Sequence, residues 1–168
     1  ARQLGAALAA EDARVLEDAF GALLANNLAQ PRVYVHRDYH SRNLMVCEDL
    51  PGVLDFQDAV YGPITYDLVS LLKDAYIRWD DEQVLDWCVL YWEKARKAGL
   101  PVRDDFGEFY RDFEWMGVQR HLKVAGIFAR LAHRDGKQQY LADVALVLDY
   151  LHEACARYRA LAPLAALL

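Results

Sequence analysis

The side chains best suited to chemistry are gathered in two short stretches of this 168-residue sequence. The first reads His36-Arg-Asp-Tyr-His-Ser-Arg-Asn43, and Asp55-Phe-Gln57 begins twelve residues after Asn43. A carboxylate such as that of Asp38 or Asp55 can take up a proton or hold a cation, and an asparagine amide oxygen is a neutral ligand for hard cations. Each residue alone would be uninformative, because Asp and Asn are common in turns. Their combination at fixed spacing indicates a functional site.

The spacing is that of the kinase catalytic loop, H-R-D-x-x-x-x-N, followed by D-F-G. Every fixed position of the first pattern is matched, and the second departs only at Gln57, where the pattern has glycine. In phosphoryl transfer the protein mainly positions the acceptor hydroxyl and neutralises phosphate charge. The pattern therefore predicts Asp38 as the catalytic base, and Asn43 and Asp55 as ligands of the Mg²⁺ that accompanies ATP.

Helices and a few short strands must position these residues. Apolar residues at helical spacing over Glu11–Ala29 predict a helix within residues 1–32, ended by Pro31. Residues 33–57 predict the catalytic loop and a metal-binding hairpin, with strands at Val33–Val35, Leu44–Cys47 and Val53–Phe56. Residues 63–168 predict a helical region, with helices at Thr65–Ile77, Asp81–Ala98, Asp105–His133 and Gln138–Leu161. We expect a mainly α fold with a small β-hairpin and catalytic-loop unit (α+β), in a single domain over residues 1–168.

Three motifs together resemble the aminoglycoside phosphotransferase and choline kinase superfamily. H-x-D-x-H-x-x-N is met by His36, Asp38, His40 and Asn43, and D-F-x-D-A by Asp55–Ala59. G-x-P-x-x-D-L is met approximately by Gly62–Leu68, without the usual acid between its glycine and proline. The resemblance implies the C-terminal lobe of a protein-kinase-like fold. More narrowly, the sequence runs His36–Val46 and Leu54–Leu72 resemble those of bacterial cell-wall-recycling kinases that phosphorylate N-acetylmuramate and N-acetylglucosamine at the anomeric hydroxyl.

The resemblance also implies roles for neighbouring residues. Met45 and Leu54 would form the nucleotide-binding floor under the adenine, while His36, His40 and Asp67 would support the loop. Asp67 could otherwise act only as an acid in the first turn of its helix. The sequence has no G-x-G-x-x-G phosphate loop. We therefore expect an N-terminal lobe to be absent from this chain, and the isolated fragment to be inactive.

The acceptor is expected to be a small molecule, because no long activation segment ending in A-P-E follows Asp55. Asp58 could touch the acceptor or cap a turn. Arg120 and Lys123 could reach an acceptor carboxylate or lie on a solvated helix face, and we favour the solvated face. Arg37 and Arg42 could also bind an anionic group, but we interpret them as solvated. An N-acetylated amino sugar is the expected acceptor. Alternatives are an aminoglycoside or choline, or a non-catalytic kinase-like binding module.

Composition limits the partners and the compartment. The net charge of −6 gives no general attraction to nucleic acid or to an anionic membrane. The apolar runs are too short to span a membrane, and we read no signal peptide near the first residues. Cys47, Cys88 and Cys155 form no metal-ligand pattern, and we expect three small core residues in a reducing compartment, the cytoplasm.

Overall fold

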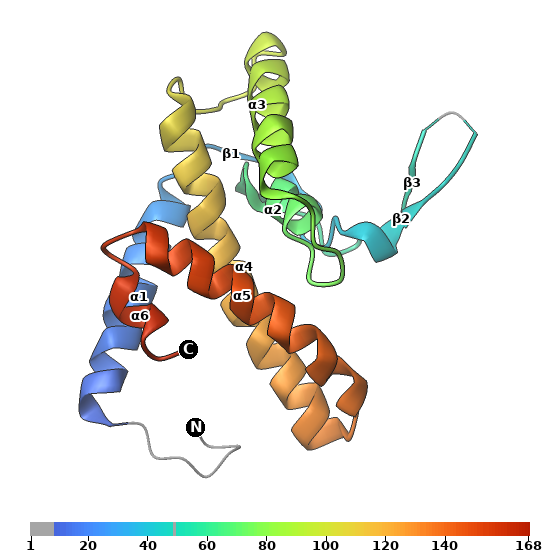
Figure 1. Cartoon of the computed structure of the whole chain (residues 1–168). Helices are drawn as coiled ribbons and strands as arrows, with labels where there is room; N and C mark the ends of the chain where they lie inside the picture. Colours follow the sequence, from blue (N-terminus) through green and yellow to red (C-terminus); the bar gives the residue numbers. More distant parts are fainter. Residues whose placement is uncertain (1–8, 49) are drawn as a thin grey trace. The chain divides into compact units, whose positions relative to one another are not determined.

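A computed structural model describes residues 9–48 and 50–168 of the chain (Figure 1). It is mainly helical with two small sheets, which confirms the expected fold class. Contacts divide the chain into two compact units, one comprising Asn26–Gly117 and the other the residues up to Ala25 together with Val118–Leu168. We call these the loop unit and the helical unit. Helix α1 (Ala10–Leu28) and helix α4 (Phe106–Asp135) each contribute residues to both units.

The loop unit contains two antiparallel strand pairs. Strand β1 (Arg32–Val35) pairs with β4 (Val60–Pro63), with Val33 opposite Gly62. Gly62 is required there, because a Cβ atom would lie 2.9 Å from Val35 Cγ2. Strand β4 has no counterpart among the predicted elements. Its Val60-Tyr-Gly-Pro sequence carries turn residues at the end of the strand, which weakened the strand signal.

The second pair is the predicted hairpin, formed by β2 (Leu44–Met45) and β3 (Gly52–Val53). In Figure 1 it projects away from α2 and α3 of the same unit. The predicted strand over Val53–Phe56 was wrong beyond Val53. Asp55 has φ +66°, in the left-handed region, and a strand cannot continue through that conformation.

Three helical segments cover the core of the loop unit. They are α2 (Tyr66–Leu72), α3 (Asp81–Lys97) and the part of α4 up to Gly117. Their buried core residues are Val69, Leu72, Val84, Cys88, Phe109, Phe113 and Met116. The aromatic side chains of Trp79, Trp87, Tyr91 and Trp92 pack against this core.

Helix α2 is shorter than the predicted Thr65–Ile77. It ends at Leu72, and Lys73 has φ −121° and ψ 50°. Helix α3 matches its prediction closely, because Asp80 accepts a hydrogen bond from the N–H of Glu82 and Gly99 ends the helix at φ +72°. Local capping residues determine the two ends of α3, whereas the end of α2 depends on a contact with a distant segment of the chain.

A buried polar cluster joins three segments of the loop unit. Thr65 Oγ1 donates to Gln30 Oε1 at 2.6 Å, and Gln30 Nε2 donates to the carbonyl oxygen of Asp112 at 3.1 Å. Arg103 Nε donates to the buried Asp112 carboxylate at 2.8 Å. These bonds satisfy polar groups that would be costly to bury alone. They fix the start of α2 against α4.

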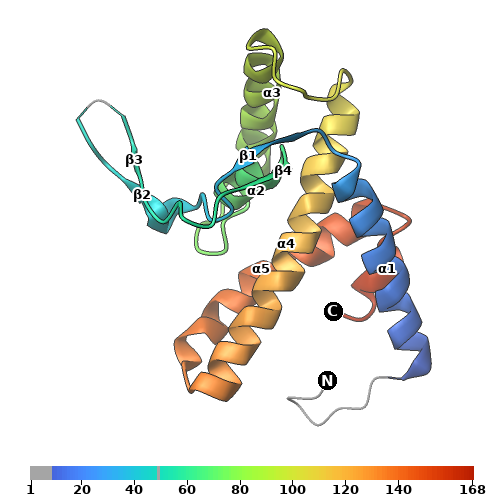
Figure 2. The ribbon, with the colours of Figure 1, turned by 180° about the vertical axis from the view of Figure 1, so that it is seen from behind.

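The helical unit consists of the second half of α4, a short η2 turn (Gln138–Tyr140), α5 (Leu141–Arg157), α6 (Ala162–Ala165) and most of α1. In Figures 1 and 2, α5 lies alongside the second half of α4, and the rings of His121 and Tyr150 stack 4.7 Å apart. The predicted helix over Gln138–Leu161 ends at Arg157. Within the described ranges, none of the helices combines the length and apolarity that crossing a bilayer requires.

The cysteines divide into one exposed and two buried residues. Cys88 and Cys155 are buried, but Cys47 is exposed beyond the end of β2, so the prediction that all three lie in the core was wrong for Cys47. The predicted strand over Leu44–Cys47 ends at Met45, which leaves the following residues without a facing strand. None of the three thiols is in a disulfide.

We expect one reactive thiol per folded chain. Burial raises the pKa of Cys88 to about 12 and that of Cys155 to about 11. Since the thiolate is the reactive form, both stay protonated and shielded at pH 8. Ellman's reagent at pH 8 should modify one thiol in the folded protein and three after denaturation, and Cys47→Ser should remove the rapid reaction. Rapid modification of a second thiol in the folded state would contradict this assignment.

Candidate active site

The loop from His36 to Asn43 connects β1 to β2 and closes on itself. Asn43 Nδ2 donates to the carbonyl oxygen of Asp38 at 2.9 Å, and the backbone N–H of Asn43 donates to the carbonyl oxygen of His40 at 3.0 Å. The last three residues form the 3₁₀ turn η1 (Ser41–Asn43). The side-chain nitrogen of Asn43 is therefore bound within the loop, and Oδ1 is the acceptor atom of this amide.

Asp67, in the first turn of α2, binds the start of the loop with both carboxylate oxygens. Oδ2 accepts from the N–H of His36 at 2.6 Å, and Oδ1 accepts from the N–H of Arg37 at 2.9 Å. Arg37 has φ +78°, a left-handed conformation that costs a non-glycine residue about 1–2 kcal/mol. The charged hydrogen bonds offset that cost, because bonds to an ionised acceptor are stronger than neutral ones.

The negative charge of Asp67 also acts on Tyr91 of α3. Burial raises the pKa of Tyr91, and the negative charge of Asp67 raises it further. Ser70, one helical turn after Asp67, donates from Oγ to the carbonyl oxygen of Arg37 at 3.5 Å. The same helix face thus contacts both the amide and the carbonyl side of Arg37.

Asp74, just beyond the end of α2, binds the far part of the loop. It is only 2% exposed, and its Oδ2 accepts from both the N–H and the Oγ of Ser41, at 2.9 and 2.5 Å. Its Oδ1 accepts from the N–H of Tyr76 at 3.1 Å. The bonds from Ser41 to Asp74 account for the early end of α2, because the chain leaves the helix where it places this carboxylate against the loop. Sequence reasoning did not identify Asp74 or Ser41. The available signal was a second aspartate seven residues after Asp67, which is about two helical turns.

Asp55 follows β3 and lies next to the residue that pairs with Asn43. The N–H of Leu54 donates to the carbonyl oxygen of Asn43 at 2.9 Å. The hairpin therefore brings the two predicted metal ligands to the same end of one strand pair. Gln57 replaces the glycine of the kinase pattern, and its Nε2 donates to Asp55 Oδ1 at 2.5 Å. The departure from the pattern thus supplies a side chain that orients the Asp55 carboxylate.

Asp58 contacts the loop through its backbone. Its carbonyl oxygen accepts from Arg37 Nη1 at 3.3 Å, while its side chain is exposed. A turn bond from the N–H of Ala59 to the carbonyl oxygen of Phe56 holds this segment. The segment after Asp55 is therefore tied to the residue before Asp38.

The two loop histidines pack against aromatic rings. The ring of His36 lies edge-on to Tyr39, with centroids 5.9 Å apart, and the ring of His40 lies edge-on to Tyr76 at the same separation. Among the described residues, no hydrogen-bond partner meets either buried ring nitrogen of His36. His36 therefore acts on the loop through packing.

Arg120 and Lys123 lie in the helical unit, on the second half of α4. Arg120 is only 7% exposed, so its assignment to a solvated face was wrong, whereas Lys123 is exposed. Helical-wheel spacing alone could not show this, because it places residues on a face without saying what covers the face.

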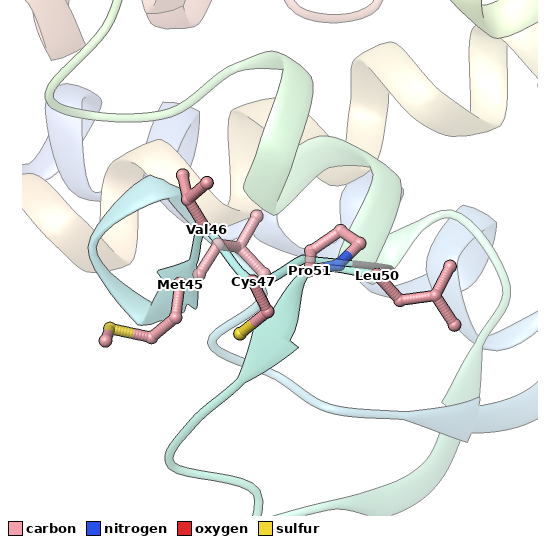
Figure 3. Close-up of a pocket in the computed structure, with 6 residues that line it drawn as sticks. Met45, Val46, Cys47, Leu50 and Pro51 are labelled. Atoms are coloured by element: carbon pink, nitrogen blue, oxygen red, sulfur yellow. The ribbon is translucent and has the colours of Figure 1, made fainter.

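Met45 and Leu54 lie on the β2–β3 hairpin with side chains 53% and 49% exposed. Met45, but not Leu54, lines a shallow hollow of about 270 Å³ (Figure 3), whose lining residues are Leu44, Met45, Val46, Cys47, Leu50 and Pro51. The sticks in Figure 3 show an almost entirely apolar lining, with sulfur atoms at Met45 and Cys47. A flat apolar ligand group or another part of the protein could cover the exposed apolar side chains of this hairpin.

Comparison with known sequences connects this geometry to phosphoryl transfer. A sequence model described as the Phosphotransferase enzyme family matches residues 1–100. The chain is 60% identical, over all 168 of its residues, to the N-acetylmuramate/N-acetylglucosamine kinase of Neisseria meningitidis serogroup B, of which it covers 50%. It is 53% identical over 146 residues to the protein of that name from Pseudomonas putida, covering 87% of this chain and 43% of the relative.

A more distant protein of the same name, from Caulobacter vibrioides, is 33% identical over 155 residues, covering 89% of this chain and 41% of the relative. The chain therefore spans about half the length, or less, of the curated relatives it matches.

Asp67→Asn should loosen the start of the loop, because an amide can accept from only one of the two N–H groups that the carboxylate binds. Losing a hydrogen bond to a charged acceptor should speed amide exchange at His36 and Arg37 by about tenfold to a hundredfold. Hydrogen exchange followed by NMR or mass spectrometry measures this. Asp86→Asn, at an exposed position on α3, is the matched control. Unchanged exchange in the Asp67 variant would contradict the role in loop support.

Proposed function

Because this chain belongs to the phosphotransferase enzyme family, we propose that the whole protein is an ATP- and Mg²⁺-dependent kinase. It transfers the γ-phosphoryl group of ATP to a hydroxyl of a small molecule. The observation that carries the proposal is the bond from Asn43 Nδ2 to the Asp38 carbonyl, which sets the proposed base and a proposed metal ligand in one closed loop.

Asp38 serves as the catalytic base. Its carboxylate hydrogen-bonds the acceptor hydroxyl and takes the proton as the hydroxyl oxygen bonds to the γ-phosphorus. The bond between that phosphorus and the β–γ bridging oxygen breaks, and ADP leaves. The backbone around Asp38 is restrained on both sides, by Asp67 at His36 and Arg37 and by Asn43 at the Asp38 carbonyl. Such restraint supports the alignment that this reaction requires.

The residues fit a magnesium ion. Asn43 Oδ1 and the Asp55 carboxylate are hard oxygen donors, and their hairpin brings them to one end of a strand pair. Mg²⁺ is commonly held by one or two protein oxygens together with substrate phosphates. When bound, it neutralises charge on the phosphate oxygens. Within the described part of the chain, no group of three His, Cys, Asp or Glu side chains could hold a metal.

Met45 and Leu54 form the apolar floor under the adenine. Both are about half exposed, as expected for side chains that a nucleotide or another lobe covers in the complete protein. The relatives are about twice as long as this chain. We propose that an N-terminal lobe in the full-length protein supplies the phosphate-covering loop and lysine that kinases use.

The acceptor is an N-acetylated amino sugar, and the reaction belongs to cell-wall recycling. The support for the amino sugar is the name that the relatives share, including the one that is 60% identical. His36, His40 and Asp67 support the loop. The exposed side chain of Asp58, on the segment after Asp55, is proposed to contact the sugar.

Asp38→Asn should lower kcat by about a hundredfold to ten thousandfold, because the amide cannot take the proton. The measurement is ATP-dependent phosphorylation by the full-length protein, with N-acetylmuramate, N-acetylglucosamine, kanamycin, choline and a peptide as acceptors. Asp104→Asn, at an exposed loop position, is the matched control.

Turnover of kanamycin or choline alone would retain the mechanism and refute the sugar acceptor. No turnover of any acceptor, together with no Mg²⁺-dependent ATP binding, would indicate a non-catalytic binding module.

Asp55→Asn should raise the Mg²⁺ concentration needed for half-maximal activity by roughly tenfold or more, because the site loses its anionic protein ligand. A magnesium titration at saturating ATP and sugar measures the shift, and Asp104→Asn again serves as the control. An unchanged magnesium requirement would exclude Asp55 as a ligand.

A further inference from the structure

The guanidinium group of Arg42 stacks on the ring of Tyr76. Its guanidinium carbon lies 3.4 Å from the centroid of the Tyr76 ring. Stacking of this kind holds the flat face of the guanidinium by a cation–π interaction. The five N–H donors lie in the plane of the group, so stacking leaves them directed outward in a fixed fork.

The surroundings restrain both partners of this stack. Ser41, immediately before Arg42, and the backbone N–H of Tyr76 are hydrogen-bonded to the same buried carboxylate, that of Asp74. Asn43, immediately after Arg42, is bonded to Asp38. One carboxylate therefore fixes the backbone of the stacked pair, and the guanidinium is held only four residues from the proposed base.

Among the described residues, the charge of Arg42 has no carboxylate partner. Over residues 9–48 and 50–168, no carboxylate lies within salt-bridge distance of Arg42, although the residue is exposed. Other arginines do have carboxylate partners, as Arg103 does at Asp112 and Arg134 at Asp135. A rigid, uncompensated guanidinium fork beside a catalytic loop is suited to binding an anion, and a carboxylate matches its bidentate geometry.

We propose that Arg42 binds a carboxylate on the acceptor sugar and so makes the enzyme favour an acidic amino sugar over a neutral one. The inference rests on the proposed kinase function. The names of the relatives pair two sugars that differ in this group, because N-acetylmuramate is N-acetylglucosamine carrying a lactyl ether with a carboxylate. The neutral sugar offers no group for Arg42 to bind.

The test compares the two sugars in the full-length protein. Arg42→Gln should lower kcat/KM for N-acetylmuramate by about tenfold to a hundredfold, the range expected for hydrogen bonds to a charged group. The change should lie mainly in KM, because the carboxylate is bound equally before and during phosphoryl transfer. The kcat/KM for N-acetylglucosamine and the KM for ATP should stay within about twofold. Arg42→Lys should restore part of the loss, since it keeps the charge and loses the fork.

Arg96→Gln is the matched control, because Arg96 is an exposed arginine stacked on an aromatic ring, with its guanidinium carbon 4.7 Å from the centroid of Trp92 on α3. It should affect neither sugar. An equal loss for both sugars, a changed KM for ATP, or no change in Arg42→Gln would overturn the assignment of Arg42 and leave the kinase function standing. If the unsubstituted protein phosphorylates neither sugar, the proposed function fails first and the inference fails with it.

Discussion

The site depends on two carboxylates that hold one loop from the two ends of one short helix. Asp67 accepts two backbone N–H groups at the start of the loop, and Asp74 accepts from Ser41 near its end. The loop itself has little regular structure, and Arg37 lies in a left-handed conformation that is unfavourable for its residue type. Without these bonds the unsatisfied N–H groups and the backbone strain would favour other conformations. Helix α2 thus acts as a rigid support to which the loop from His36 to Asn43 is fixed.

Helix α2 is itself held in place at both of its ends. At its start, Thr65 is fully buried and is joined to α4 through Gln30. At its end, the Lys73 ammonium lies 3.8 Å from the buried Glu114 carboxylate of α4. Gly117 lies beside the Lys73 stem, and a Cβ there would be 3.4 Å from Lys73 Cδ, at van der Waals contact. A buried ion pair is weak evidence for stability, but it can fix the position of the segment that carries it. Here the pair fixes Lys73 and thereby the position of Asp74, the next residue.

The sequence was most informative where the signal was local. The helix predicted over Asp81–Ala98 was found at Asp81–Lys97, and the loop motif placed Asp38 and Asn43 in one loop. It was least informative where a long-range contact decides the structure. Helix α2 stops at Leu72 because Asp74 binds Ser41, thirty-three residues away, and no local pattern contains that bond. Arg120 is buried for the same kind of reason, since the residues that cover a helix face lie elsewhere in the chain.

The carboxylate of Asp74 links two functions that sequence motifs treat separately. Through Ser41, Asp74 supports the loop that carries the proposed base, and through Tyr76 it holds the ring on which Arg42 lies. A change at Asp74 would therefore disturb both the alignment for chemistry and the proposed recognition of the acceptor. Arg42 and Tyr76 lie outward of this carboxylate, where a substitution can alter acceptor choice while the bonds of Asp67 and Asn43 to the loop remain. Specificity can vary at such a site without loss of the phosphoryl-transfer machinery, because the two depend on a shared anchor but on different side chains.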